Sequence, residues 1–385
     1  MEEQQKLKTV FSSVINRKKL KKSKSNYRLS HFLNLKIIYL ITLIIITLIK
    51  TKNILVFINN NNQNILFAYK NDKIENTNKN QIHITYSLDN KISYPTLVSM
   101  ISGLENNNQK SNIIIFHLLL SYNFNKSNID IFESLKNNYE VKINYYLIPG
   151  FFSYLKSWTL GTECIYYKIF IPIIFRDLSR IIHLDGDTLI RKDILEMYNY
   201  PFKNNYILGH PFFMPHVMDK FGINATHYIT VGCVLFNIEK IVYDKRDSEL
   251  IQFTLKNNNK LIFPEQDAIN FVFYPNIDFL PLKYGIYMIE DDKALERINF
   301  KLRTKINLTE GKQAIADPSI IHFSCCWPKV WNNKTKNLFG GKNVCLRYQK
   351  EFYYYANKTK YFSIIYDYFY LNEEIRYKKK KKNNI

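Results

Sequence analysis

The sequence contains few cysteines, and their spacing excludes the common zinc modules. There are five cysteines among 385 residues, and no two of them form a C-x-x-C pair. A zinc finger needs cysteines and histidines at such short spacings to hold its metal. Cys325 and Cys326 are adjacent and cannot easily pair with each other, and the odd count leaves at least one thiol free or intermolecular.

Acidic residues are also scarce, with 33 Asp and Glu against 54 Lys and Arg, which gives a net charge of +21. Residues 1–36 hold ten basic residues against two Glu, and residues 372–385 hold six against two, so 12 of the 21 net charges lie in the two tails. The sequence also lacks a basic helix followed by heptads, so we expect no nucleic-acid partner. The remaining charge suits an anionic substrate.

A long apolar run lies near the N-terminus. Residues 32–49 read FLNLKIIYLITLIIITLI, and their single charge, on Lys36, can reach the membrane interface. Because about 20 apolar helical residues span a bilayer, we expect a single transmembrane helix, an uncleaved signal anchor, at residues 32–50. Residues 37–49 would also suit a cleaved signal peptide, but the KTKN that follows offers no small-residue cleavage site.

The basic residues before this run predict its orientation. By the positive-inside rule, residues 1–31 form a cytoplasmic basic tail and the bulk of the chain faces the lumen of the Golgi or the ER, as in a single-pass type II membrane protein. N-x-[ST] triplets agree with a lumenal location; they begin at Asn125, Asn224, Asn307, Asn333 and Asn357. Residues 51–80 contain the low-complexity run NNNNQN, and we expect them to form a flexible stem.

From residue 81 the pattern is typical of an α/β domain. Strands are expected at 82–88, 112–120, 141–148 and 180–184, and helices at 94–106, 127–138 and 163–173. This alternation predicts a parallel sheet with right-handed crossovers, whose ligands bind beyond the carboxyl ends of the strands. Asp89 ends the first strand, and Asp185 and Asp187 end the fourth, so the acidic groups gather at the ligand-binding edge.

The stretch IIHLDGDTLIRKDI places two carboxylates at a strand end, and a helix start is expected after them. In an extended chain, Asp185 and Asp187 project to the same side, and Gly186 lets the backbone turn tightly and approach a ligand. Two such carboxylates repel each other unless a cation lies between them. Hard divalent ions such as Mg²⁺ or Mn²⁺ suit them, and such an ion would stabilise a departing diphosphate.

Three other interpretations of this motif stay open. Asp and Gly favour turns, so the motif could be a solvated turn. It also resembles the D-x-D-G-T motif of aspartate-dependent phosphohydrolases, although Thr188 stands where that motif has glycine. A general acid and base for glycoside hydrolysis would need carboxyls about 5 Å or more apart.

Five blocks in this order carry a resemblance to a known family. They read ITYSLDNKISYPTLVSMISGLEN, YYKIFIPIIFRDLSRIIHLDGDTLIRKDI, VGCVLFNIEK, PEQDAIN and IIHFSCCWPKVW. Together they resemble glycosyltransferase family 8, which includes glycogenin and the bacterial lipopolysaccharide glucosyl- and galactosyltransferases. The resemblance runs from about residue 81 to residue 331.

The resemblance implies an α/β fold of the GT-A (Rossmann-like) type with a mixed, mainly parallel sheet. It also implies a retaining transferase that uses a UDP-sugar and Mn²⁺ (or Mg²⁺). Asp185 and Asp187 match the family's metal-binding aspartates, and His322 matches its third protein ligand. Imidazole is a suitable partner for Mn²⁺ beside two carboxylates.

Other residues match the family's donor-binding positions. Ser87 and Asp89 match the loop that holds the uridine, and Lys168 stands where the family usually has arginine near the sugar and phosphates. Lys329 matches the lysine that meets the diphosphate, and Gln266 matches the glutamine near the anomeric carbon. With Gly186, these residues complete the expected donor site.

Besides Lys168, the sequence departs from the family pattern at four positions. Glu265 replaces the usual aspartate before the glutamine, and Thr230 replaces the asparagine of an Asn-x-Gly stretch. Cys325 stands where glycine is usual, and Lys329 lies one residue further from His322 than expected. These changes concern the identity of the sugar and the closure of the C-terminal loop, and they leave the metal residues intact.

The implied mechanism is front-face displacement, in which UDP leaves and the acceptor hydroxyl attacks on the same face. We therefore expect transfer of a hexose, glucose or galactose first, to a glycan, glycoprotein or glycolipid, with Asp187 and Gln266 as catalytic residues. Glu265 and Thr230 would contact the sugar. The alternatives are a catalytically silent UDP-sugar-binding relative and an aspartate-dependent phosphohydrolase.

The catalytic domain is expected at residues 81–345 and an aromatic-rich helical tail with a poly-Lys end at residues 346–385. The tail is expected to pack on the core; the alternative is an amphipathic helix that rests on the membrane or binds the acceptor.

Overall fold

The computed structural model describes residues 79–108, 110–148, 163–212, 215–286, 291–324, 329–331 and 344–365. The chain divides into a unit of residues 1–53 and a unit of residues 54–385, and every described residue belongs to the second. The expected anchor at 32–50 and nearly all of the expected stem at 51–80 lie outside the described residues. Within the described part, no helix combines the length and the hydrophobicity that crossing a bilayer requires.

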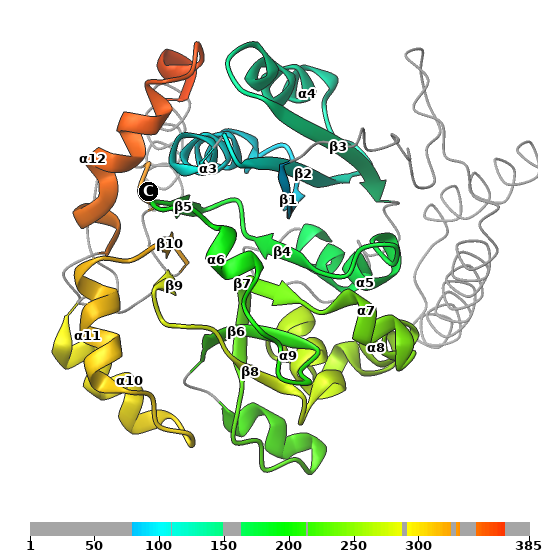
Figure 1. Ribbon diagram of the computed structural model, residues 1–385. Helices are drawn as coiled ribbons and strands as arrows, with labels where there is room; N and C mark the ends of the chain where they lie inside the picture. The colour runs from blue at the N-terminus through cyan, green and yellow to red at the C-terminus, as the bar shows by residue number, and fades with distance from the viewer. Residues whose placement is uncertain are drawn as a thin grey trace, which may run out of the picture. The chain divides into compact units, whose positions relative to one another are not determined.

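A seven-stranded sheet in the order β3-β2-β1-β4-β7-β6-β8 forms the centre of this unit (Figure 1). Its strands are β1 (Asn80–Leu88), β2 (Asn112–Ser121), β3 (Val141–Ile148), β4 (Ile181–Leu184), β6 (Ile207–Pro211), β7 (Ile229–Phe236) and β8 (Ile277–Phe279). Strands β3, β2, β1 and β4 run parallel, as do β6 and β8, whereas β7 is antiparallel to β4 and β6. The expected mixed, mainly parallel sheet is confirmed.

Three short strands form a second sheet in the order β5-β10-β9. They are β5 (Thr188–Ile190), β9 (Tyr284–Ile286) and β10 (Ile320–His322). Strand β10 is antiparallel to β5, and its register places His322 opposite Thr188. Because Thr188 directly follows Asp187, this pairing brings the C-terminal part of the domain to the two aspartates.

Helices cover both faces of the large sheet. Helix α3 (Ser93–Asn106) packs on one face, where the Tyr86 hydroxyl of β1 and Ser99 Oγ are 2.9 Å apart. The 3₁₀ helix η4 (Glu163–Phe170) and helix α5 (Ile171–Ile174) lie on the other, where the ring of Phe175 meets that of His117 of β2 at 4.8 Å. Side chains alternate between the faces along each strand, so each face has its own core.

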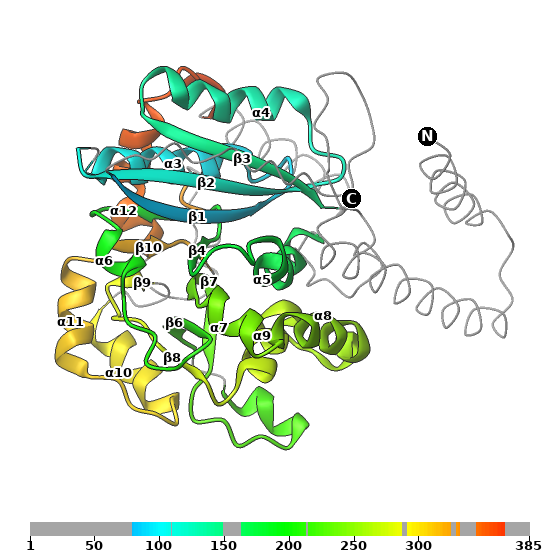
Figure 2. The same ribbon diagram turned by 45° about the vertical axis from the view of Figure 1, so that its right-hand side comes forward.

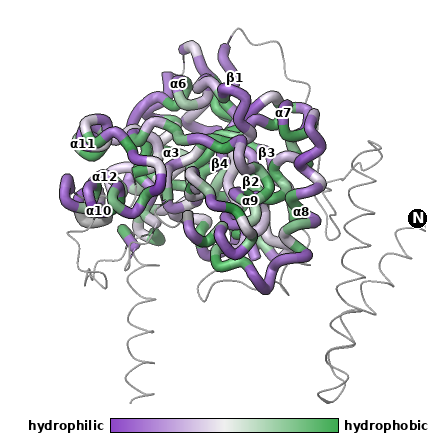
Figure 3. Tube along the Cα trace, turned by 90° about the horizontal axis from the view of Figure 1, so that it is seen from below, coloured by the Kyte–Doolittle hydropathy of each residue, from purple (hydrophilic) through white to green (hydrophobic). Residues whose placement is uncertain are grey.

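The remaining helices surround these layers (Figure 2). They are α4 (Lys126–Glu133), η2 (Ser134–Asn137), α6 (Leu195–Tyr198), η5 (Pro215–Phe221), α7 (Ile238–Tyr243), α8 (Arg246–Asn257), η6 (Asn258–Lys260), α9 (Pro264–Phe273), α10 (Asp292–Lys301), α11 (Leu308–Ala316) and α12 (Val344–Ala356). Apolar residues concentrate around the central strands, α10 is largely hydrophilic, and α11 carries both kinds of residue (Figure 3). This is the expected division between core and surface.

Helix α12, in the aromatic tail, packs on the core over its described part. Its Phe352 is fully buried, and the Phe352 ring lies 5.7 Å from that of Trp331. Asn106 of α3 donates a hydrogen bond to the Tyr355 hydroxyl at 2.7 Å. This helix therefore covers α3 and the chain that follows β10.

Two local expectations differ from the structure. Strand β5 directly follows Asp187, and the helix start expected there comes only at Leu195 of α6. Residues 163–170 form a 3₁₀ helix, and only residues 171–174 are α-helical. Pro172 has no N–H to donate to the Lys168 carbonyl, so the α-helical hydrogen-bond ladder cannot run through this point.

Candidate active site

The turn Asp185–Gly186–Asp187 lies where the two sheets meet. The Asp185 N–H donates to the Gly232 carbonyl of β7 at 2.7 Å, and the Phe323 N–H donates to the Asp187 carbonyl at 2.8 Å. The Thr188 hydroxyl donates to the Asp185 carbonyl at 2.9 Å. Backbone bonds to both sheets therefore fix the turn, and its carboxylates are held in place.

Gly186 is required by a close approach to helix α3. A Cβ added at Gly186 would lie 2.2 Å from Thr96 Oγ1 and 2.8 Å from Ile92 Cγ1, which is closer than real Cβ atoms come. The glycine lets the turn rest directly on α3. The helix thus supports the two carboxylates from behind.

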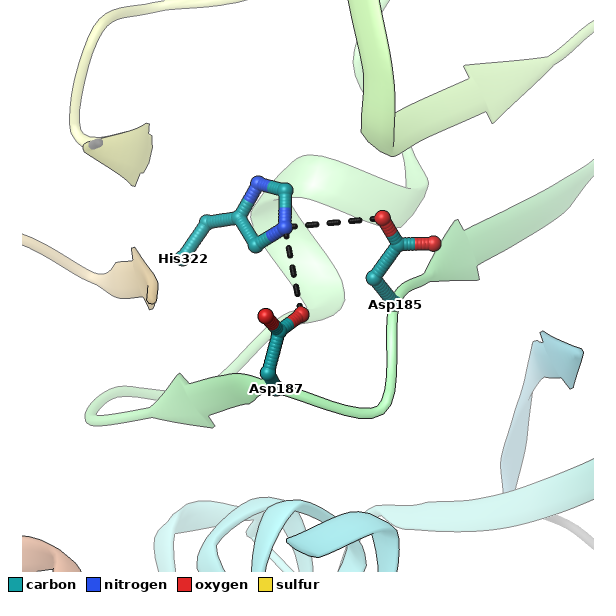
Figure 4. Close-up of side chains that lie close together, drawn as sticks. All are labelled: Asp185, Asp187 and His322. Carbon is teal, nitrogen blue, oxygen red and sulfur yellow. Dashed lines mark ion pairs between the residues drawn. The ribbon is translucent and has the colours of Figure 1, made fainter. Parts of the chain in front are cut away.

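His322 at the end of β10 completes a three-residue cluster with the two aspartates (Figure 4). Its Nε2 lies 3.5 Å from Asp185 Oδ2 and 3.3 Å from Asp187 Oδ1. One ligand atom from each residue falls within 4.8 Å of the others. His322 is 3% exposed, whereas the side chains of Asp185 and Asp187 are 30% and 12% exposed, so the cluster opens to solvent through the carboxylates.

The residues present fit a divalent cation. Two carboxylates and one imidazole are a donor set that suits Mn²⁺ or Mg²⁺. The space for the imidazole depends on Gly232, where an added Cβ would lie 2.1 Å from His322 Cε1 and 2.7 Å from Asp185 Oδ2. Gly232 therefore forms a cradle that only a residue without a side chain can provide.

A lysine binds the outer oxygen of each carboxylate. Lys168 Nζ lies 2.8 Å from Asp185 Oδ1, and Lys329 Nζ donates to Asp187 Oδ2 at 2.5 Å and to the Phe323 carbonyl at 2.9 Å. The inner oxygens, Asp185 Oδ2 and Asp187 Oδ1, face His322. The two lysine ammonium groups thus leave the inner carboxylate oxygens directed at a common point.

The charges of the cluster shift its pKa values. Burial raises the pKa of each aspartate, but Lys168 next to Asp185 and Lys329 next to Asp187, together with His322, outweigh it and hold both pKa values well below the usual range. Burial lowers the pKa of His322, and the two carboxylates raise it to about 9. Both carboxylates are therefore ionised at neutral pH.

Glu265 lies on the far side of Lys168. Its Oε1 is 3.7 Å from Lys168 Nζ, and its Oε2 is buried without a hydrogen-bond partner among the described residues. Burial raises the pKa of Glu265, while Lys168 opposes the shift. Lys168, itself 4% exposed, is thus shared between Glu265 and Asp185.

Gln266, the next residue of α9, is held by a hydrogen-bonded chain. Its Nε2 donates to the Tyr228 hydroxyl at 3.2 Å, and that hydroxyl donates to Asp267 Oδ1. Asp267 Oδ2 accepts from the N–H groups of Ile262 and Phe263 at 2.6 and 3.1 Å. These bonds therefore fix the Gln266 side chain in the first turn of α9, next to Glu265.

The profile of the family described as Glycosyl transferase family 8 matches residues 83–335, well over half of the chain. The chain belongs to glycosyltransferase family 8. The expectation drawn from the five sequence blocks is confirmed.

Two curated relatives of this family 8 chain are bacterial. A protein of Haemophilus influenzae that carries a glycosyltransferase name is 22% identical over 264 residues, 67% of this chain and 75% of that protein. A lipopolysaccharide 1,2-glucosyltransferase of Escherichia coli is 23% identical over 221 residues, 54% of this chain and 64% of that protein.

Two solved structures share the fold. The bifunctional glycosyltransferase WbbM superposes with a TM-score of 0.60 at 18% identity, over 79% of this chain and 54% of that one. The galactosyltransferase LgtC, solved with donor and acceptor sugar analogues, gives a TM-score of 0.58 at 14% identity, over 72% of this chain and 96% of that one. The GT-A-like α/β fold is confirmed.

Other predicted site residues of this family 8 chain lie on the same edge. Ser87, the residue before the last of β1, has a buried hydroxyl with no partner among the described residues. Asp89 Oδ1 accepts from the N–H groups of Lys91 and Ile92 at 2.9 and 3.2 Å, which fixes the start of α3. Thr230 is buried on β7, and Cys325 lies outside the described residues.

The sequence analysis missed three residues of the site: His183, Gly232 and Tyr228. His183 Nε2 lies 3.3 Å from Asp185 Oδ1, and burial lowers the pKa of His183 to about 4, so it stays neutral. Its position two residues before Asp185 in the same strand was a usable signal, since i and i+2 share a face. Gly232 is the glycine of the Asn-x-Gly stretch that begins at Thr230, so the family pattern marked its position, whereas the contacts of Tyr228 are made by distant segments and no local pattern marks them.

Proposed function

We propose that this family 8 chain is a retaining, divalent-metal-dependent glycosyltransferase that moves a hexose from a UDP-sugar to a glycan or glycoconjugate acceptor. The observation that carries the proposal is the cluster of Asp185, Asp187 and His322, whose ligand atoms lie within 4.8 Å of one another. A bound Mn²⁺ or Mg²⁺ would supply positive charge that stabilises the departing diphosphate. Asp185, Asp187 and His322 would hold that ion.

The other side chains have separate roles in this proposal. Lys168 and Lys329 lie beside the carboxylates, and each can neutralise a phosphate oxygen of the donor. Glu265 Oε2, buried without a partner among the described residues, can accept a hydrogen bond from a sugar hydroxyl. Gln266 would place its amide oxygen near the anomeric carbon, where positive charge develops as the bond to the diphosphate breaks. The departing phosphate oxygen takes the proton of the acceptor hydroxyl.

Glucose and galactose are the first donor sugars to test, since the E. coli relative is named a glucosyltransferase and LgtC a galactosyltransferase. The acceptor would be a glycan, glycoprotein or glycolipid. In the same proposal, residues 32–50 anchor the chain in a Golgi or ER membrane with the catalytic domain in the lumen.

Two alternatives are separated by simple assays. A silent UDP-sugar-binding relative, motivated by Thr230 and Glu265, would bind UDP in calorimetry without turnover. An aspartate-dependent phosphohydrolase would release phosphate from a generic phosphomonoester. The contacts of Asp185 with Lys168 and with two histidines argue against a free nucleophile there.

The deciding experiment is a screen of UDP-hexoses with and without Mn²⁺ that measures released UDP. We expect release from one donor, dependent on the metal and abolished by Asp187→Asn, because the substitution removes a charged ligand. Asp130→Asn, which changes an exposed aspartate on α4, is the matched control and should keep full activity. Full metal-dependent activity of Asp187→Asn would contradict the proposal, as would the absence of UDP release from every donor.

A further inference from the structure

A buried tyrosine lies between Gln266 and the protein core. Tyr228 immediately precedes β7, is 1% exposed, and places its hydroxyl between the Gln266 amide and the Asp267 carboxylate. The proposed function gives a role to Gln266 but none to Tyr228 or Asp267. The direction of the hydrogen bonds along this chain determines which way the Gln266 amide faces.

Asp267 fixes the direction. Its carboxylate receives three hydrogen bonds, from the Tyr228 hydroxyl and from the N–H groups of Ile262 and Phe263. A carboxylate only accepts, so the single proton of the Tyr228 hydroxyl is committed to Asp267. The Tyr228 oxygen can then only accept from Gln266, and the Gln266 amide must turn its NH₂ group toward Tyr228.

The Oε1 atom of the same amide therefore cannot point at the Tyr228 hydroxyl. The side-chain oxygen of Gln266, Oε1, accepts no hydrogen bond from the described residues. The backbone carbonyl of Gln266 and the backbone N–H and carbonyl of Ile229 are all hydrogen-bonded to the side chain of Asn270. Reversing the amide would leave Oε1 facing the lone pairs of the Tyr228 oxygen. Such a reversal costs a buried hydrogen bond.

The tyrosine lies on the chain segment that leads to the metal cluster. Tyr228 directly precedes β7, the strand that carries Thr230 and Gly232, and a Cβ added at Gly232 would lie 2.1 Å from His322 Cε1. Phe212 and Phe263 pack around this region, with the Phe212 ring 5.7 Å from that of Tyr228 and 5.3 Å from that of Phe263. The ring is thus held by packing, which keeps its hydroxyl between Asp267 and Gln266.

We propose that Tyr228, with its proton committed to Asp267, is a positioning residue that turns the side-chain amide oxygen of Gln266 (Oε1) toward the anomeric carbon of the donor. This inference rests on the proposed function, because it assigns the Gln266 oxygen to the reaction. It adds a residue whose effect passes entirely through Gln266. The hydroxyl, and not the ring, carries that effect.

The test is Tyr228→Phe in the full chain, which removes the hydroxyl and keeps the ring. We expect kcat to fall roughly tenfold to a hundredfold, with the KM for the UDP-hexose and for Mn²⁺ unchanged within about twofold. In a Gln266→Ala background the same substitution should lower kcat by no more than about twofold, because the group it positions is gone. A merely structural role would lower activity equally in both backgrounds.

Tyr206→Phe is the matched control. Tyr206 is also buried and donates its hydroxyl to an aspartate, Asp244, at 2.9 Å. It lies at the start of β6 and makes no contact with the metal cluster among the described residues. We expect a comparable loss of melting temperature and an unchanged kcat.

The outcomes separate the two proposals. If the wild type is active and Tyr228→Phe keeps its kcat within twofold, the inference is overturned and the proposed function stands. If the wild type turns over no UDP-hexose, the proposed function fails. The melting temperatures of the two single variants and the double variant then decide whether Tyr228 holds Gln266 in place. Non-additive losses would show that Tyr228 holds Gln266, and additive losses would overturn that as well.

Discussion

At the scale of single residues, the site depends on a glycine as much as on its charged groups. Gly232→Ala would place a Cβ 2.1 Å from His322 Cε1 and 2.7 Å from Asp185 Oδ2. The imidazole would have to leave the cluster, because the Gly232 carbonyl accepts from the Asp185 N–H and the next residue pairs with β4, which holds this backbone in place. We expect Mn²⁺ affinity to fall at least about tenfold, measured by calorimetry on the purified chain.

Gly311→Ala is the matched control for this substitution. A Cβ at Gly311 would meet Leu295 at 2.5 Å, so it crowds the contact between α10 and α11, somewhat less closely than the 2.1 Å contact that Gly232→Ala would make in the site. It should lower the melting temperature and leave Mn²⁺ affinity unchanged. Equal Mn²⁺ affinities of Gly232→Ala and the wild type would show that the cradle is not needed.

Single residues also show what the sequence could and could not reveal. Asp185 and Asp187 were predicted because their spacing and strand context are local, and His322 because it matched a family block. The partners of Gly232 and Tyr228 come from β10 and α9, and no periodicity in the sequence records such contacts. Their roles follow only from the packing of the folded chain.

At the scale of elements, the four predicted strands and the helices predicted at 94–106 and 127–138 match the structure closely, and the helix predicted at 163–173 matches only in part. The runs at 82–88, 112–120, 141–148 and 180–184 fall within or close to β1, β2, β3 and β4. Buried parallel strands are continuous apolar runs, which are easy to recognise. The stretch 163–173 has a helical pattern of apolar residues, but Pro172 limits the α-helical part to four residues. The three-residue strands β5, β9 and β10 are too short to leave a pattern.

Three adjacent strands share a buried line of polar rings. His83 Nδ1 of β1 lies 3.0 Å from His117 Nε2 of β2, and His117 Nδ1 lies 3.0 Å from the Tyr146 hydroxyl of β3. Tyr198 from α6 and Phe175 cover the pair with their rings. When both histidines are neutral, one arrangement of their protons satisfies both hydrogen bonds of the line. A further proton on either imidazole would place a positive charge next to the other imidazole.

This line predicts that stability falls in acid. Burial lowers the pKa of His83 to about 4 and holds that of His117 well below 6.5, its usual value. Between pH 6.5 and 4 the unfolded chain binds a proton at His83 that the folded chain does not, so the free energy of unfolding decreases as pH falls. The slope for His83 is about 1.4 kcal/mol per pH unit, and His117 acts in the same direction.

The measurement is the free energy of unfolding at several pH values between 7.5 and 4. Replacing His83 and His117 together by leucine should make the dependence shallower, even if stability at pH 7.5 is lower. His216→Leu, which removes an exposed histidine of η5, should leave the slope as it is. An unchanged slope in the double variant would mean that other groups cause the acid sensitivity.

At the scale of the whole molecule, the family and the fold were predictable because several blocks in a fixed order are far more specific than any one of them. The net charge is concentrated in the two terminal tails, which distinguishes them from the body of the chain. The body matches the family profile over residues 83–335. The anchor, the stem and the lumenal orientation concern residues outside the described part, and they stay predictions.

The predicted anchor has a direct test, because every contact that the structure describes lies within residues 79–365. A chain that begins at Lys79 keeps all of β1 and the ion pair of Lys79 with Glu140, 2.5 Å apart. We expect it to keep the melting temperature and the kcat of the full chain and to stay in the supernatant after centrifugation. The full chain should sediment with membranes and resist alkaline extraction, because about 20 apolar residues in a helix anchor a chain stably. If the shortened chain also sediments, residues 32–50 are not the sole anchor, and the aromatic tail after Ile365 is the segment to delete next.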